Sequence, residues 1–278
     1  MKPMEIGVFS ASLHPANPED LFKRLAQVDL RVIQLGLIDP AWLRPAVVDQ
    51  LERLLKSSGV EVAASFFGFP DEDYSTIPRI RQTGGFVTDF EARLAVVREV
   101  IKISKRLRIP AVGAHAGFIP EDPDDPQYAV MIERIGNVAD EMKAAGLRML
   151  LETGQETPDG LLQVLADLGR DNVAVNFDPA NILLYGVGEP IEAARKLGRH
   201  IASVHAKDAT ASGRQDVWGS EKLLGEGAVN YPVFLRTLRE GGFTGPLIIE
   251  CEIPGIEPIR SVSHARDRLR ACLADMAE

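Results

Sequence analysis

Four short apolar segments in the second half of the chain each end at an acidic residue or a histidine. The segments are residues 147–151, 173–177, 201–204 and 246–249, which are followed by Glu152, Asp178, His205 and Glu250. Because helix-like sequence separates them, we expect parallel neighbouring strands whose carboxyl ends meet at one edge of a sheet. Three carboxylates and one imidazole gathered there would suit one divalent cation. We expect Mn²⁺, with Mg²⁺, Co²⁺ and Zn²⁺ as alternatives.

The segment 173–178 shows why these polar side chains need a partner. Strand side chains alternate between two faces, which places Ala174, Asn176 and Asp178 on one face and three apolar residues on the other. An amide and a carboxylate on a buried face cost free energy unless a ligand or a polar partner shares the space. The pattern therefore indicates a functional site in addition to a strand.

The whole chain alternates between strand-like and helix-like segments. The expected strands cover residues 6–9, 30–35, 60–67, 110–115, 147–152, 173–178, 201–205 and 246–250. Helix signals follow each strand, with a cap at Asn17 and then the segments 45–56, 88–106, 129–145, 157–169, 190–197, 231–241 and 258–276. An open doubly wound sheet would carry a Gly-rich turn after its first strand, and residues 9–14 read Phe-Ser-Ala-Ser-Leu-His instead. The sequence therefore predicts an α/β protein, a (β/α)8 TIM barrel that forms a single domain over residues 1–278.

Two long polar segments, residues 68–87 and 208–227, follow the third and the seventh expected strands. Loops of this length in a compact domain are usually lids or binding loops, so we expect both to close over a substrate. Trp218 of the second loop would either anchor that loop or stack on the face of a sugar.

The composition argues against several classes of partner. A net charge of −9 and a pI near 5.2 oppose binding to a nucleic-acid backbone. No apolar run reaches the length of a membrane span. The two cysteines, Cys251 and Cys272, show no metal or disulfide spacing, and we interpret both as buried thiols of a cytoplasmic protein.

Four segments of the chain resemble the xylose-isomerase-like TIM-barrel family, the sugar phosphate isomerase/epimerase superfamily. They are residues 151–156 (LETGQE), 176–181 (NFDPAN), 204–208 (VHAKD) and 249–252 (IECE), and the segment 224–227 (LGEG) fits as well. Any one of these motifs is weak, but four in order at barrel-strand spacing are fairly specific. The resemblance extends over essentially the whole chain.

The resemblance implies that Glu152, Asp178, His205 and Glu250 bind one divalent metal, and that the two glutamates form an acid–base pair. A metal that chelates a carbonyl oxygen and the neighbouring hydroxyl acidifies the C–H bond between them. One glutamate would remove that proton and the other would return a proton on the opposite face, which inverts the carbon.

Four further residues are candidates for binding a substrate. His115 ends the fourth expected strand and would either contact substrate or form a satisfied histidine of the core. Glu156 would either contact substrate or stabilise the N-terminus of the helix that follows it. Asn181 stands where ketose 3-epimerases carry a histidine that positions a substrate hydroxyl. Lys207 and Asp208 stand where those enzymes place an arginine, and Lys207 would either bind an anionic or hydroxyl group or lie in solvent.

The function that these residues favour is a metal-dependent isomerase or epimerase that acts on a ketose or a related polyol. A dehydratase or lyase of a keto-inositol, a hydroaromatic acid or a keto-glycoside would use the same proton abstraction. A metal-stabilised barrel that serves as a non-catalytic accessory subunit is the alternative of a different class. The expected partner is a small-molecule sugar or polyol, and both a homodimer and a homotetramer stay open.

Overall fold

The computed structural model describes residues 4–276 and shows one closed barrel of eight parallel strands. The ends of the expected domain, residues 1–3 and 277–278, lie outside the described residues. The order around the barrel is β1-β10-β7-β6-β5-β4-β3-β2. The barrel strands are β1 (Ile6–Phe9), β2 (Val32–Gly36), β3 (Glu61–Phe66), β4 (Ala111–Ala114), β5 (Arg148–Glu152), β6 (Val173–Phe177), β7 (Ile201–Ala206) and β10 (Leu247–Ile249). The predicted TIM barrel is confirmed.

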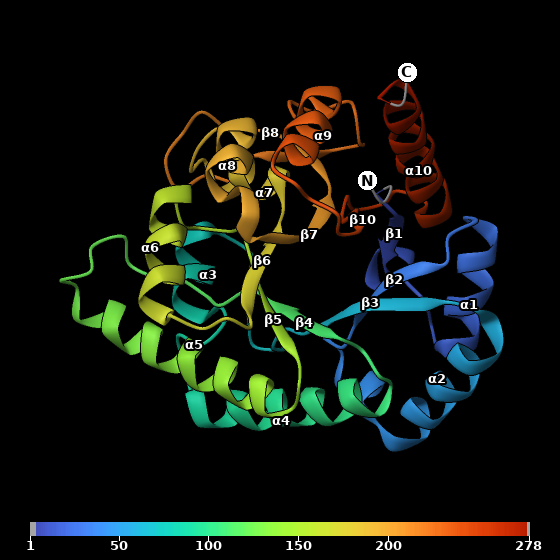
Figure 1. The fold of residues 1–278 in the computed structure, drawn as a ribbon, viewed down its shortest axis with the longest axis horizontal. Coiled ribbons are helices and arrows are strands. Elements are labelled where there is room, and N and C mark those ends of the chain that lie inside the picture. The colour runs from blue at the N-terminus through green and yellow to red at the C-terminus, as the bar shows by residue number, and fades with distance from the viewer. Residues whose placement is uncertain (1–3, 277–278) are drawn as a thin grey trace.

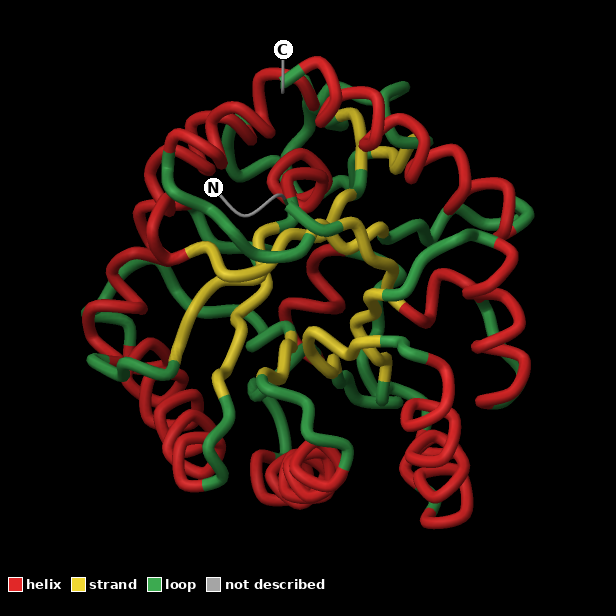
Figure 2. Tube along the Cα trace, turned by 45° about the vertical axis from the view of Figure 1, so that its right-hand side comes forward, coloured by secondary structure: helices red, strands yellow, loops and turns green. Residues whose placement is uncertain are grey.

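Seven helices connect successive barrel strands, and an eighth follows the last strand. These helices surround the strands, as Figure 2 shows. They are α1 (Pro18–Gln27), α2 (Pro45–Ser58), α4 (Phe90–Arg106), α5 (Pro126–Ala144), α6 (Pro158–Leu168), α8 (Pro190–Leu197), α9 (Tyr231–Glu240) and α10 (Pro258–Asp275). Their first turns satisfy free N–H groups with side chains: Asn17 accepts from the Asp20 N–H and Thr157 from the Gly160 N–H. Within residues 4–276, none of the helices is both long and apolar enough to cross a membrane.

The predicted alternation of side chains in β6 is present. Val175 and Phe177 lie in the large core between the strands and the helices, whereas Ala174 belongs to a small cluster inside the barrel. Above this cluster the interior is filled by Phe9, Phe66, Ile248 and their neighbours. Small side chains below and aromatic rings above form a packed floor under the carboxyl ends of the strands.

Gly113 of β4 makes room for this floor. A Cβ atom built on Gly113 would lie 2.8 Å from the ring of Phe66, closer than side-chain atoms normally approach. The Phe66 ring in turn lies 5.6 Å from the ring of His205, measured between ring centroids. A glycine in this strand therefore fixes the aromatic layer on which the histidine rests.

The structure corrects the sequence-based expectations at the carboxyl face. The two long loops are partly regular: residues 68–87 contain α3 (Ile77–Thr83), and residues 208–227 contain the hairpin of β8 (Asp208–Thr210) and β9 (Ser220–Lys222). A further helix, α7 (Pro179–Tyr185), directly follows Asp178. These elements are only three to seven residues long, too short to show a hydrophobic period.

Two smaller expectations were also wrong. Helix α4 is capped by Asp89, whose side chain accepts from the Ala92 N–H, and it begins at Phe90, two residues later than the expected segment 88–106. Cys251 and Cys272 are free thiols but only half-buried. Cys251 lies beyond the end of β10 and Cys272 on the outer helix α10, so neither is enclosed by the core.

Candidate metal centre

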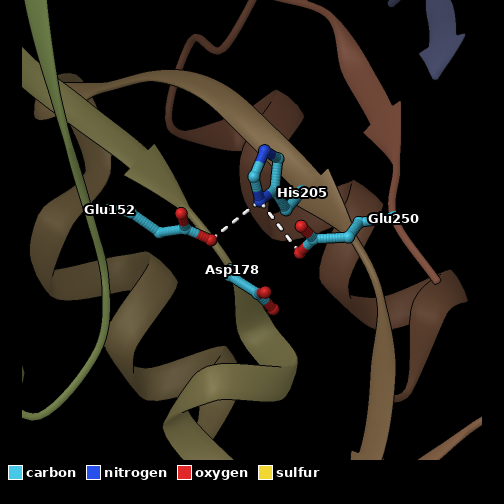
Figure 3. A group of neighbouring side chains, drawn as sticks. All are labelled: Glu152, Asp178, His205 and Glu250. Atoms are coloured by element: carbon cyan, nitrogen blue, oxygen red, sulfur yellow. Dashed lines mark hydrogen bonds and ion pairs between the residues drawn. The ribbon is translucent and has the colours of Figure 1, made fainter. Parts of the chain in front are cut away.

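Glu152, Asp178, His205 and Glu250 converge inside the mouth of the barrel. Glu152 ends β5, Asp178 follows β6, His205 lies in β7 and Glu250 follows β10, and these four strands are consecutive around the barrel. Each residue offers one ligand atom, and the four atoms lie within 4.8 Å of one another. Figure 3 shows the three carboxylates arranged around one nitrogen of the imidazole. The group is buried and could hold a metal ion.

The two ring nitrogens of His205 face different partners. Nδ1 lies 2.7 Å from Glu152 Oε1 and 3.1 Å from Glu250 Oε2. Nε2 lies 2.5 Å from Gln34 Oε1, at the bottom of the site. An amide oxygen only accepts hydrogen bonds, so Gln34 favours the tautomer with a proton on Nε2. Once deprotonated, Nδ1 would present its lone pair to the space between the carboxylates, as a metal-binding histidine does.

The two carboxylate oxygens of Asp178 differ: one accepts hydrogen bonds from the backbone, and the other has no hydrogen-bond partner. Its Oδ1 accepts from the N–H groups of Ala180 and Asn181 and begins α7. The hydroxyl of Thr153 accepts from the Asp178 N–H and donates to the Asp178 carbonyl, which fixes the backbone. Oδ2 is buried and has no hydrogen-bond partner, and Lys207 Nζ lies 3.9 Å away. A buried carboxylate oxygen without a donor fits a cation, because only a strong partner offsets its loss of hydration.

Burial and charge act in opposite directions on the pKa values of these residues. Burial raises the pKa of Asp178 well above its usual value, and Lys207 only partly opposes this. Burial alone would lower the pKa of His205, but the carboxylates of Glu152 and Glu250 raise it well above its usual value. The pKa of Glu250 is lowered, because His205 and Lys207 outweigh the effect of burial. Binding of a divalent cation would favour the deprotonated form of every ligand and release protons.

Two of the predicted substrate-binding residues contact Glu152. His115 Nε2 lies 3.4 Å from Glu152 Oε2, and its side chain stays one-quarter exposed to the cavity. Asn181 Nδ2 lies 3.4 Å from Glu152 Oε1 and donates to the Thr153 carbonyl at 3.0 Å. His115 is therefore a histidine of the site and not only a satisfied core residue.

Lys207 is buried, which excludes the alternative that it lies in solvent. Its ammonium group lies 3.2 Å from Glu250 Oε2 and forms an ion pair with Glu252. Burial alone would lower the pKa of Lys207, but Glu250, Glu252 and Asp178 raise it well above its usual value. The hydroxyl of Tyr231 donates to the Lys207 carbonyl and holds the backbone from below.

Asp208 organises the loop after β7 and does not face the cavity. Its carboxylate accepts four backbone N–H groups, those of Ala209, Gly225, Gly227 and Val229. A Cβ atom on Gly227 would lie 2.1 Å from Asp208 Oδ1, so glycine is required at this contact. The segments 204–208 and 224–227 of the resemblance thus form one structural unit.

Glu156 is buried beside the group of candidate ligands, in a small recess that Glu152 and His115 also line. Its Oε1 accepts from the Ile119 N–H at 3.3 Å, and burial raises its pKa to about 7. The N–H of Thr157, at the start of α6, is instead taken by Glu121 at 2.6 Å. Of the two alternatives for Glu156, stabilisation of this helix terminus through the Thr157 N–H does not occur, because Glu121 accepts that group.

A cavity of about 840 Å³ opens above the cluster. Its apolar wall includes Phe9, Phe66, Tyr185 and Trp218, and its outer part is lined by Glu221 and Glu252. Trp218 packs edge-on against Tyr185, with 4.7 Å between the ring centroids, and also faces the cavity. Both interpretations of Trp218, as a loop anchor and as a surface on which a sugar could stack, fit this position.

Several residues of the site are not among those predicted from the sequence. Gln34 carried a usable signal, because it is a polar residue in an apolar strand, as the four ligands are. Thr153 and Glu252 follow Glu152 and Glu250 closely in sequence, yet no strand pattern indicates which way they point.

The barrel is closed, and a group of carboxylate and imidazole side chains lies at the carboxyl ends of the strands. This arrangement is typical of TIM-barrel proteins that could bind a metal at that face. The profile of the xylose isomerase-like TIM barrel family matches residues 22–272, and the chain belongs to this family. A xylose isomerase domain protein from Planctomyces limnophilus is 31% identical and superposes with a TM-score of 0.88, covering 99% of each chain.

Two further similar proteins are epimerases by name. The L-ribulose-5-phosphate 3-epimerase UlaE of Escherichia coli is 24% identical, in an alignment that covers 87% of this chain and 95% of the relative. A solved L-ribulose 3-epimerase is 19% identical and shares the fold with a TM-score of 0.75, covering 98% of this chain and 95% of that structure.

Proposed function

We propose that the protein is a divalent-metal-dependent isomerase or epimerase that abstracts a proton next to the carbonyl group of a ketose or a related polyol. The observation that carries this proposal is the placement of Glu152 and Glu250 on opposite sides of His205 Nδ1, 2.7 and 3.1 Å away. The two similar epimerases support it, since one is named for L-ribulose 5-phosphate and the other for L-ribulose, and both names contain the same ketose.

The four ligands fit a hard or borderline divalent cation, for which we propose Mn²⁺ first. Glu152, Asp178, His205 and Glu250 would hold it, and the free Oδ2 of Asp178 supports this assignment. When bound, such a cation polarises a carbonyl group and stabilises the negative charge that develops after proton loss.

Glu152 and Glu250 are the proposed base and acid. They stand three strand steps apart around the barrel, a separation that would let them act on opposite faces of a substrate held between them. One carboxylate removes the proton from carbon and the other delivers a proton to the opposite face. His115 lies against Glu152 and Lys207 against Glu250, so each carboxylate has a polar neighbour that positions it.

We assign substrate binding to four residues around this pair. His115 and Asn181 line the cavity on the Glu152 side and Lys207 on the Glu250 side, where each would contact a substrate hydroxyl while staying paired with its carboxylate. Glu156 lines a small adjoining recess together with His115 and Glu152.

A dehydratase is the second candidate, and Glu156 is the observation that favours it. Because its pKa is raised to about 7, a large fraction of Glu156 is protonated at neutral pH. A protonated carboxyl group beside the site could donate its proton to a departing hydroxyl group after the same proton abstraction.

Incubation with a panel of ketoses in D₂O and Mn²⁺ tests these functions. Epimerisation places deuterium on the carbon next to the carbonyl group, and dehydration lowers the mass by one water. A protein that binds metal but does neither would be an accessory subunit, and the proposal would be wrong.

A further inference from the structure

We propose, on the basis of the proposed function, that the substrate is an uncharged ketose or polyol and not a sugar phosphate. Among the described residues that line the 840 Å³ cavity, five are glutamates, and the basic ones are a single lysine and a single histidine. The glutamates are Glu72, Glu152, Glu221, Glu250 and Glu252. One divalent cation offsets only part of this charge, so the cavity opposes a ligand that carries a charge near −2.

The lysine of the cavity is committed to the protein's own acids. Lys207 Nζ forms an ion pair with Glu252, lies 3.2 Å from Glu250 Oε2, and lies 3.9 Å from Asp178 Oδ2. The side chain is only 4% exposed. A phosphate group would have to displace a carboxylate to reach it, and the displaced carboxylate would repel the phosphate.

The histidine of the cavity, His115, is also paired with a carboxylate of the protein. His115 Nε2 lies 3.4 Å from Glu152 Oε2, deep on the side of the proposed base. A phosphate at His115 would lie against the carboxylate that must accept a proton from carbon. Neither basic residue of the cavity is therefore placed to receive a terminal phosphate.

A group of N–H donors that could bind an anion lies at the rim of the cavity, but the Glu72 carboxylate already occupies it. The Glu72 carboxylate accepts the N–H groups of Phe69 and Gly85 at 2.9 and 2.7 Å, and Arg93 Nη1 lies 3.8 Å away. Converging backbone N–H groups beside a guanidinium are typical of phosphate and carboxylate sites. Here Arg93 also donates to the carbonyls of Gly85 and Thr83, so these donors hold the loop and are closed to a ligand.

The outer acids instead suit hydroxyl groups. Glu221 is half-buried and accepts the Glu252 N–H at 2.8 Å, and the carboxylate of Glu252 is 62% exposed toward the mouth. Carboxylates accept hydrogen bonds from sugar hydroxyls without any charge on the ligand. The rings of Phe66 and Trp218 offer apolar surface to the C–H groups between those hydroxyls.

Ligand binding can be measured without turnover in the metal-loaded protein. In a Trp42→Phe background, Trp218 becomes the only tryptophan, so its fluorescence reports on the cavity. The probes are D-sorbitol, D-sorbitol 6-phosphate and inorganic phosphate. We expect sorbitol to bind at least about tenfold more tightly than its phosphate ester, because like charges are placed together only at a cost. Equal or tighter binding of the phosphate ester, or no binding of sorbitol, would overturn the proposal.

Charge variants test the cause of the preference. Glu252→Gln should release Lys207 and reduce the preference for sorbitol by several fold, and Glu221→Gln should act in the same direction. Glu240→Gln is the matched control, since it removes the same charge from an exposed residue at the end of α9, outside the cavity. An unchanged preference in both cavity variants, with folding verified by thermal melting, would show that these acids do not set it.

Solvent-deuterium exchange with D-fructose and D-fructose 6-phosphate separates this inference from the proposed function. Exchange into the free ketose alone supports both. Exchange into the phosphate ester alone overturns the inference and leaves the proposed function standing. If neither ketose exchanges while sorbitol still binds in preference to its phosphate, the proposed function fails and the charge selectivity holds.

Discussion

Arg81 of α3 and Asp216 of the β8–β9 hairpin form an ion pair across the two long segments of the carboxyl face. Arg81 Nη2 lies 3.0 Å from Asp216 Oδ1, although 135 residues separate them in sequence. The guanidinium also lies over the ring of Phe118, with 4.9 Å to the ring centroid. The two expected lids thus touch each other through a contact between opposite charges.

We predict that this ion pair restrains both segments. Both side chains are more than one-third exposed, so the pair contributes at most about 1 kcal/mol to the contact between the segments. Arg81→Ala should speed backbone hydrogen exchange in the hairpin, and Asp216→Ala should speed it in α3. High salt should have the same effect in the wild-type protein.

The control is Arg79→Ala, which removes an ion pair inside the first segment. In that pair, Arg79 Nε lies 2.8 Å from Asp73 Oδ2. That variant should loosen α3 without changing exchange in the hairpin. Equal exchange in the hairpin of all three variants would show that the two segments move independently of the Arg81 contact.

Asp178→Asn should weaken metal binding by at least about tenfold, because it removes a formal charge from a hard-cation site. The amide oxygen can still accept from the Ala180 and Asn181 N–H groups, so the start of α7 should remain intact. Isothermal titration with Mn²⁺ measures the affinity, and circular dichroism verifies the fold. Wild-type affinity in a folded variant would remove Asp178 from the ligand set.

Glu152→Gln and Glu250→Gln should each lower turnover by at least about 100-fold, the lower range for loss of a general base. Both changes keep the size of the side chain and an oxygen ligand, so we expect more metal to be retained than in Asp178→Ala. Each variant could still exchange the substrate proton on the face that the remaining carboxylate reaches. Wild-type turnover in both variants would refute the two-carboxylate mechanism.

Glu156 should make the protein less stable as the pH rises. Its pKa is about 7 in the folded protein, against an ordinary value of 4.5, so the folded state holds the proton more tightly than the unfolded state. The free energy of unfolding should therefore fall between about pH 4.5 and 7, by about 3 kcal/mol for a shift of this size.

Chemical denaturation of the wild-type protein and of Glu156→Gln at pH 5 and pH 8 measures this effect. The variant should lose less stability between the two pH values, because its amide does not ionise. A parallel loss in both proteins would mean that Glu156 keeps an ordinary pKa. Glu240→Gln serves again as a control for an exposed carboxylate.

The sequence predicted the barrel because its strands carry a signal that depends only on local pattern. In β6 the period of two separates Phe177 from Asn176, and both lie where that period places them. The same pattern located the four ligands, since each ends an apolar strand. Gln34 shows the limit of this reasoning, because a polar residue inside a strand has a role only once a neighbouring strand brings His205 to it.

The loops were harder to predict, since their order depends on contacts between distant residues. Asp208 holds the segment 225–229 through side-chain bonds to backbone N–H groups, and Glu72 holds Phe69 and Gly85 in the same way. A single acidic residue in a polar segment gives no sign of such a role in the sequence. The burial of Lys207 was hidden for the same reason, because its partner Glu252 lies 45 residues further along the chain.

The consecutive placement of the four ligand strands has a consequence for protein engineering. All four ligands stand on or directly after β5, β6, β7 and β10, whereas the segment 68–87 follows β3 on the opposite side of the barrel. That segment forms part of the cavity wall and supplies no member of the quartet. It is therefore a suitable target for directed evolution. Variants of this segment could change the substrate specificity of the cavity while the four ligands stay unchanged.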